Sequence, residues 1–156
     1  MENGSEHVDE GARFLLVRSG GYRCAIPVDA AKLVTKATET TALPGSAPRF
    51  LGLAQIAGEP VAVVDLHALL DPGGEPGGGH EMTVIVRGPS AGATLGLAVD
   101  EAMGVVSLRV EQERSDGDPT WVSGHSRMDA RPIVILDPTE LFDGSASPEK
   151  GAFDAA

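Results

Sequence analysis

The chain has 156 residues, of which 42% are hydrophobic and only 4% aromatic. It can therefore form one domain, or two small subdomains that share a core of aliphatic side chains. Its net charge of −11 argues against binding to nucleic acid or to an anionic membrane surface, because both need clustered Lys and Arg. The single cysteine, Cys24, excludes an internal disulfide, and its apolar neighbours predict a buried, inert thiol rather than a reactive one.

The two ends of the chain and its middle have polar or turn-rich compositions. Residues 1–11 carry four acidic and no basic residues and lack the basic and apolar parts of a signal peptide. We expect them, and residues 143–156, to be disordered. Residues 71–80, DPGGEPGGGH, predict a flexible loop between one subdomain over about 12–70 and a second over about 81–142. No apolar run approaches the roughly 20 residues of a membrane span, so we expect a soluble, cytoplasmic protein.

Apolar runs of strand length, separated by turn residues, recur along the chain. Their spacing is typical of barrels or sandwiches rather than of an alternating α/β sheet. Single helical turns are expected at 67–70 and at 138–142, where Asp137 is a suitable N-cap. The predicted strands, in chain order, cover residues 14–17, 22–26, 50–57, 61–66, 82–87, 94–99, 105–110 and 132–136, with a loop at 111–119 and a local cluster at 121–124.

Turn residues predict two hairpins among these strands. Gly20-Gly21 joins the first two runs, and Gly58-Glu59-Pro60 interrupts the apolar stretch over 50–66. Between the hairpins, residues 27–36 predict a short helix, because Pro27 suits a first helical turn and apolar residues recur at three-residue spacing. A turn leading into a strand over 33–41 is the alternative.

No group of residues forms a convincing catalytic or metal site. The histidines form neither an i, i+4 pair nor a cluster with cysteine. The serines beside His125 lack the strand–serine–helix elbow of a hydrolase, so we expect their hydroxyls to bond backbone nearby. The triple glycine at 77–79 lacks the Lys-Ser/Thr that follows a phosphate-binding loop. The histidines are His7, His67, His80 and His125, and the serines beside His125 are Ser123 and Ser126.

Two carboxylates each follow an apolar strand, Asp65 and Asp100. A pair of this kind could do acid–base chemistry only if burial separated the two pKa values. We favour the simpler interpretation that each accepts local N–H bonds at the end of its strand. Similarly, Val84 and Val99 are core candidates by default, and an exposed apolar groove for a partner helix is the alternative.

Four blocks in order give the chain a family resemblance. It resembles the CheW-like adaptor family of bacterial chemotaxis from about Phe14 to Phe142. Each block alone is weak, but their order and spacing together are specific. The blocks are 14–17 with 22–26; Pro48, Phe50 and Gly52 with Gly58 and 63–66; 95–102 with 105–108; and 121–124 with 133–137 and 140–142.

The resemblance implies an all-β fold of two small five-stranded SH3-like barrels packed on a shared apolar core, with a few short helices. It also implies a protein without enzymatic activity, metal or cofactor. Members of this family couple chemoreceptors to the regulatory domain of a CheA-type histidine kinase. The receptor's cytoplasmic hairpin tip lies in a groove between the barrels, and the kinase meets exposed barrel ends.

Matching positions give candidate contact residues. Those expected in the receptor-binding groove are Ala31, Ala57, Val84 and Val99, and those expected on the kinase-binding surface are Leu33, Val34 and Gly52.

The central segment departs from the family pattern. The usual Asn-Leu-Arg-Gly is replaced by Gln55 to Gly58, so Ala57 stands where the family carries an arginine associated with receptor coupling. We therefore expect a charge-assisted contact of roughly 1.5–3 kcal/mol to be missing. Leu33 is apolar where an acidic residue is common. An alternative role is therefore a one-sided accessory that has lost one of the two contacts. An alternative of another class is a small-molecule-binding β-barrel, which would need a closed pocket with convergent polar groups.

Overall fold

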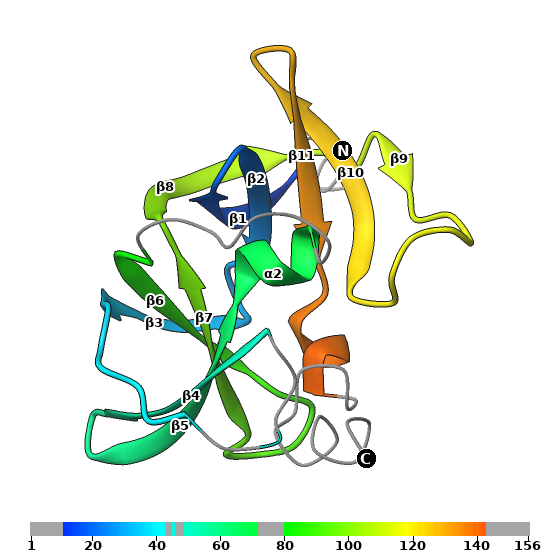
Figure 1. Ribbon diagram of the computed structural model, residues 1–156. Helices are drawn as coiled ribbons and strands as arrows, with labels where there is room; N and C mark the ends of the chain where they lie inside the picture. The colour runs from blue at the N-terminus through cyan, green and yellow to red at the C-terminus, as the bar shows by residue number, and fades with distance from the viewer. Residues whose placement is uncertain (1–10, 43–44, 46–48, 72–79, 143–156) are drawn as a thin grey trace.

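The structure is a computed structural model that describes residues 11–42, 45, 49–71 and 80–142. Strands dominate these residues, with one short α-helix and one 3-10 helix (Figure 1). The elements are β1 (Ala12–Ser19), β2 (Tyr22–Pro27), β3 (Ala31–Lys36), β4 (Phe50–Ile56), β5 (Glu59–Asp65), α2 (Leu66–Leu70), β6 (Met82–Arg87), β7 (Thr94–Val99), β8 (Glu101–Leu108), β9 (Gln112–Glu113), β10 (Val122–Met128), β11 (Arg131–Leu136) and η1 (Pro138–Phe142).

The strands form two sheets, which lie in the upper and lower halves of Figure 1. The first sheet has the order β8-β1-β2-β11-β10-β9, and the second has the order β3-β6-β7-β5-β4. Each contains one parallel pair, β2 with β11 and β5 with β7, and its other pairs are antiparallel. The all-β fold with few helices is as the sequence predicted.

Each sheet closes on itself. In the second sheet, the chain beyond β3 reaches the opposite edge, where Thr41 and Leu53 exchange two backbone hydrogen bonds of 2.8 and 2.9 Å. In the first sheet, the edges β8 and β9 belong to one bent stretch of chain, and Glu111 N donates to His125 O at 2.9 Å in the bend. Counted with β8 and β9 as one strand, both sheets are five-stranded barrels, here called the first and second barrel.

The barrels are not formed by the two halves of the chain. The second barrel uses the contiguous strands β3 to β7, whereas the first combines β1 and β2 with β8 to β11. The strands are therefore not divided at residues 71–80, where we expected a boundary between subdomains; residues 72–79 lie outside the described residues. The chain crosses between the barrels after Pro27 and at Asp100.

The two barrels contain an internal repeat that we did not predict. Residues 49–70 and 121–142 align without a gap at a separation of 72 residues. Both copies form a hairpin followed by a helical turn, and both have a register shift just before a glycine, Gly52 or Gly124. Both hairpins turn through two residues with positive φ. The identical pairs are Gly52 and Gly124, Pro60 and Pro132, Asp65 and Asp137, and Leu69 and Leu141.

Apolar side chains on both faces of the strands build three clusters. Along β1, Leu15 and Val17 point into a large core shared by the two barrels, whereas Phe14 and Leu16 fill the interior of the first barrel. A third cluster around Val63 fills the second barrel. Because both faces are buried, the strands are continuously apolar rather than alternating. Among the described residues, apolar side chains thus occupy the interiors of both barrels, where a small-molecule binder would need a cavity.

The helix predicted over 27–36 is wrong. A turn, in which Ala30 N donates to Pro27 O at 2.9 Å, leads into β3 at Ala31. Strand β3 pairs with β6, a partner about 50 residues away, and tertiary pairing of this kind overrides weak local propensity. The alternative of a turn followed by a strand is closer to the structure. The local cluster predicted at 121–124 instead begins the longer strand β10, and the predicted loop at 111–119 contains the two-residue strand β9.

Candidate partner-binding surfaces

One end of the second barrel carries exposed apolar side chains. Leu33 and Val34 on β3 are 43% and 37% exposed. Leu33 lines a hollow of about 120 Å³, and Ala57, at the turn between β4 and β5, lies on the same hollow. The structure thus brings together Leu33 and Ala57, which the family resemblance assigned to different partners. The hollow is lined by Lys32, Leu33, Ile56, Ala57, Glu59, Val61, Ile85 and Thr94.

Ala57 is exposed and held in an unusual backbone conformation. Its φ is 54° and that of Gly58 is 83°, the pattern of a two-residue hairpin turn whose twist matches the flanking strands. The side chain at position 57 therefore points away from the core at the tip of the hairpin. An arginine at this position would extend its guanidinium next to the hollow, whereas alanine offers neither charge nor donors.

Three of the predicted contact residues are not on the surface. Val84 and Val99 have no exposed area and belong to the core shared by the barrels, so the prediction that they contact a partner directly is wrong. Gly52 is also buried, with φ at 139° and its α-carbon packed against the Thr41 backbone. It closes the second barrel rather than facing a kinase. Ala31 is half-buried and pairs with Val86.

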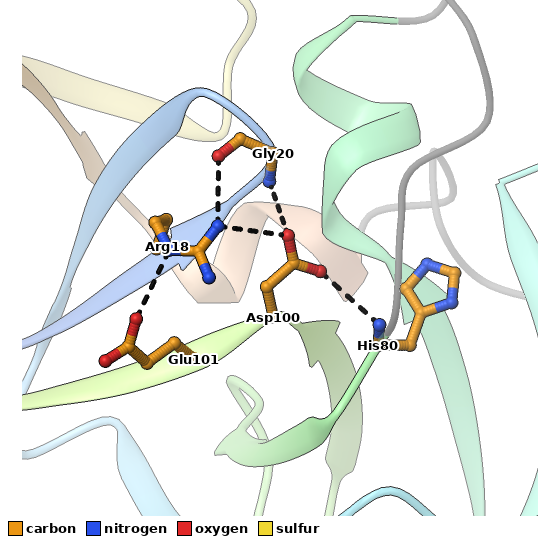
Figure 2. Close-up of polar contacts among 5 residues, drawn as sticks. All are labelled: Arg18, Gly20, His80, Asp100 and Glu101. Carbon is orange, nitrogen blue, oxygen red and sulfur yellow. Dashed lines mark hydrogen bonds and ion pairs between the residues drawn. The ribbon is translucent and has the colours of Figure 1, made fainter.

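A polar network joins the barrels where the chain crosses from β7 to β8 (Figure 2). Asp100 Oδ2 accepts hydrogen bonds from Gly20 N at 2.8 Å and Arg18 Nη1 at 3.4 Å, and its Oδ1 accepts from His80 N at 3.4 Å. Its own N–H donates to Arg18 O at 2.9 Å. Arg18 Nε also reaches Glu101 at 3.2 Å. One carboxylate therefore fixes the β1–β2 turn, the approach to β6 and the crossover.

Asp65 has a related structural role. Its Oδ1 accepts from His67 N at 3.0 Å and so caps helix α2, as predicted. The same oxygen lies 3.0 Å from His80 Nε2, but the ring is not aligned for a directional hydrogen bond. This contact is an ion pair only when the ring is protonated. Both carboxylates that follow apolar strands thus hold local N–H groups and approach His80.

The remaining chemical candidates are also structural. Burial raises the pKa of the Cys24 thiol to about 12, which makes it inert, as predicted. Ser126 Oγ donates to Arg109 O at 2.7 Å and Ser123 Oγ to Ile135 O at 3.3 Å, so these hydroxyls bond to backbone. His125 Nε2 lies 3.1 Å from Asp118. The N–H of Ser115, followed by His125, lowers the pKa of Asp118.

Within the described ranges, no three His, Cys, Asp or Glu side chains converge to hold a metal ion. His7 and the triple glycine at 77–79 lie outside those ranges. In the part of the chain that the structure describes, no helix has both the length and the apolar character needed to cross a membrane.

Comparison with known proteins connects this architecture to a family. Residues 13–146 match the CheW-like domain. The chain belongs to the CheW-like family. Its members are non-enzymatic scaffolding proteins, which places this CheW-like protein among the scaffolds or adaptors of chemotaxis.

A solved structure with the same fold is that of the scaffolding protein TtCheW from Thermoanaerobacter tengcongensis. It matches with a TM-score of 0.73 at 19% sequence identity, over 88% of this chain and 97% of that chain. A search of curated protein sequences found no match.

The sequence contained one signal that would have located these surfaces better. In the 72-residue repeat, the turn at Ala57 corresponds to the turn at Asp129, and Gly52 corresponds to Gly124. Such a correspondence identifies Gly52 as a structural element of both barrels rather than as a contact residue. It does not reveal that Leu33 and Ala57 share a hollow, because that contact joins strands from separate parts of the chain.

Proposed function

We propose that this CheW-like protein is a cytoplasmic adaptor that couples chemoreceptors to a CheA-type histidine kinase. The observation that supports the kinase contact is the exposed apolar pair Leu33 and Val34 at the end of the second barrel. Leu33 lines a hollow together with Ile56, Val61 and Ile85, and contiguous exposed apolar surface marks sites of interaction between proteins. The pair stands between Lys32 and Lys36, which are exposed and would favour an acidic rim on the partner.

A second exposed apolar position supports assembly through both barrels. Val105 on β8 is 46% exposed. It lies just after a register shift in the pairing of β8 with β1, and Val34 lies just after a similar shift in the pairing of β3 with β6. The two barrels thus present equivalent apolar positions. Contacts at both would reinforce each other in an array, because linked weak contacts gain effective concentration.

For the receptor, we propose the surface around Ala31 and Ala57 as the contact, with Val84 and Val99 as the buried support beneath it. The residue at position 57 decides between the two proposed roles, an adaptor that binds both partners and an accessory that has lost the receptor contact. Without the guanidinium, the receptor contact lacks a charge-assisted hydrogen bond and is weaker by one to two decades in affinity.

The kinase contact is tested by titrating the cognate kinase regulatory domain into the full chain and into Leu33→Asp. We expect the aspartate to weaken binding by about tenfold or more, because it places a charge in an apolar contact. The matched control is Val110→Asp, since Val110 is 42% exposed but follows β8 on the other barrel. Equal effects of the two variants, or no binding of the kinase domain by the full chain, would contradict the kinase assignment.

The receptor contact is tested with Ala57→Arg and the cognate receptor signalling domain. The variant should bind about tenfold more tightly. The internal repeat supplies the control, Ala130→Arg, which adds the same single positive charge at a positive φ of 65° in the equivalent turn of the first barrel. If both substitutions strengthen binding equally, added positive charge is responsible and the proposed position is wrong.

A further inference from the structure

The first barrel has a hollow at the seam between β2 and β11, with a volume of about 370 Å³. These parallel strands are paired only at Val134 with Cys24 and at Ile135 with Ala25. Beyond those two pairs, toward the β1–β2 turn, strand pairing no longer seals the seam. The hollow is lined by Gly21, Tyr22, Arg23, Arg131, Pro132 and Val134.

The wall of this hollow combines apolar surface with positive charge. Tyr22, Pro132 and Val134 supply the apolar part. The Tyr22 ring is held edge-on to His67 of α2, with the ring centroids 6.0 Å apart, so the wall is braced by the helix between the barrels. The arginines are Arg23, which is half-buried, and Arg131, which is exposed.

The two arginines have no partner of opposite charge among the described residues. Neither forms an ion pair or a side-chain hydrogen bond with another residue of those ranges, although the chain as a whole carries a net charge of −11. Arg18, which lies opposite Arg23 in the β1–β2 register, is by contrast held by Asp100 and Glu101. Both arginines line the same hollow, so a bound anion there would offset the repulsion between their like charges.

The fold itself does not require these arginines. By the 72-residue repeat, Arg131 and Pro132 correspond to Glu59 and Pro60 in the second barrel. By the same repeat, Ile135 corresponds to Val63, and their strand partners are Ala25 and Gly96. The residue two positions before each partner is Arg23 in the first barrel and Thr94 in the second, so Thr94 is the counterpart of Arg23. The second barrel thus keeps the proline but has an acid and a neutral residue in place of the two arginines.

We propose that this hollow binds a short acidic peptide segment of a partner protein. A carboxylate would lie between Arg23 and Arg131, where charge-assisted bonds to guanidinium groups are strongest. A neighbouring apolar side chain would pack on Tyr22 and Val134. Two arginines on a strongly acidic protein suit one carboxylate rather than a polyanion such as nucleic acid, which the net charge repels. This contact lies on the first barrel and goes beyond the adaptor contacts proposed above.

The test is a titration of the ¹⁵N-labelled full chain with an N-acetylated, C-amidated peptide that contains glutamate next to phenylalanine, followed by NMR. Saturable shifts are expected at the amides of Gly21 to Arg23 and of Arg131 to Val134, except at Pro132, which has no N–H. Arg23→Gln and Arg131→Gln should each weaken binding by about tenfold. Arg127→Gln on β10, an exposed residue outside the hollow, is the matched control and should not change it.

Two further probes separate the proposal from simpler explanations. The same peptide with glutamine in place of glutamate should bind about tenfold more weakly. Equal binding of the two peptides would show that the hollow recognises only the apolar side chain, and would overturn the role of the arginines. Acetate alone should bind at least about tenfold more weakly than the peptide; equally tight binding of acetate would show an anion site without peptide recognition and would overturn the peptide assignment. Absence of saturable shifts at these amides with the glutamate peptide would overturn the proposal as a whole. Because no receptor or kinase is present, these outcomes are independent of the adaptor assignment.

Discussion

Replacement of Gly52 by alanine should open the second barrel. A Cβ at this position would collide with Thr41 O and lie 2.6 Å from Thr41 C, far inside van der Waals contact. The backbone φ of 139° is in addition a conformation that residues with a Cβ rarely adopt. The collision is with backbone, so it can be relieved only by moving the 37–42 segment away from β4.

The magnitude follows from these two effects. An unfavourable backbone conformation costs about 1–3 kcal/mol. Separation of Thr41 from Leu53 loses two backbone hydrogen bonds, each with a net value of about 1 kcal/mol. We therefore expect Gly52→Ala to lower the free energy of unfolding by about 3–5 kcal/mol, which is a large part of the roughly 5–15 kcal/mol typical of a domain.

Two other glycines serve as matched controls. Gly58 has a φ of 83° but open space where its Cβ would be, so Gly58→Ala should cost only about 1–2 kcal/mol from backbone conformation. Gly124, the repeat counterpart of Gly52, has no positive φ, and its Cβ would meet Gln112 O at 3.0 Å. Its cost should lie well below that of Gly52→Ala.

Urea denaturation followed by the fluorescence of Trp121, the single tryptophan, measures all three variants, with circular dichroism as a second probe. The expected order of destabilisation places Gly52→Ala first. If Gly52→Ala were no more destabilising than Gly58→Ala, the close approach of Gly52 to Thr41 would not control closure of the barrel, and the reasoning would be refuted.

Three further predictions follow from the polar and titratable groups. Asp100→Ala leaves the donors of Gly20, Arg18 and His80 without their acceptor and should lower the free energy of unfolding by about 1–3 kcal/mol. Glu101→Ala, which removes an exposed ion pair, should lower it by less than about 1 kcal/mol. Equal losses in urea denaturation would argue against the network. Cys24, with its pKa raised to about 12 by burial, should resist iodoacetamide at pH 8 in the native chain and react in urea, which mass spectrometry detects; rapid native labelling would contradict burial. Asp118 has a lowered pKa in the folded state, so its charged form stabilises the fold above the ordinary value of 3.8 and this contribution is lost as the pH falls through the folded pKa. Asp118→Asn should therefore be less stable than the natural chain at pH 7 and equally stable at pH 2, and a difference that persists at pH 2 would exclude this origin.

The strands could be predicted because burial on both faces leaves long apolar runs in the sequence. Phe14 to Val17 is an example, since alternate residues enter different clusters. The apolar runs also predicted Val84 and Val99 as core residues by default, as the structure has them, and their assignment to a receptor groove came from matching positions in the family. A position matched to a family pattern does not show which way its side chain points, and the runs that contain these two residues are apolar throughout.

Other features depend on contacts that local sequence does not encode. The sequence around the start of β3 resembles a helix because the apolar residues Val28, Ala31 and Val34 recur every three residues. It forms a strand because it pairs with β6. The exposure of Leu33 beside Ala57 likewise depends on how the barrel closes. The family resemblance supplied the architecture, but the direction in which each side chain points came only from the structure.

The interleaving of the barrels has a consequence for the order in which the chain can fold. During synthesis β1 and β2 emerge first, but their neighbours β8 and β11 follow more than 70 residues later. The second barrel, contiguous from β3 to β7, can be complete before then. The N-terminal hairpin must therefore wait with Leu15 and Val17 uncovered on one face and Phe14 and Leu16 uncovered on the other. Closure of the first barrel around it is a non-local step, of the kind that slows folding and exposes apolar surface to aggregation.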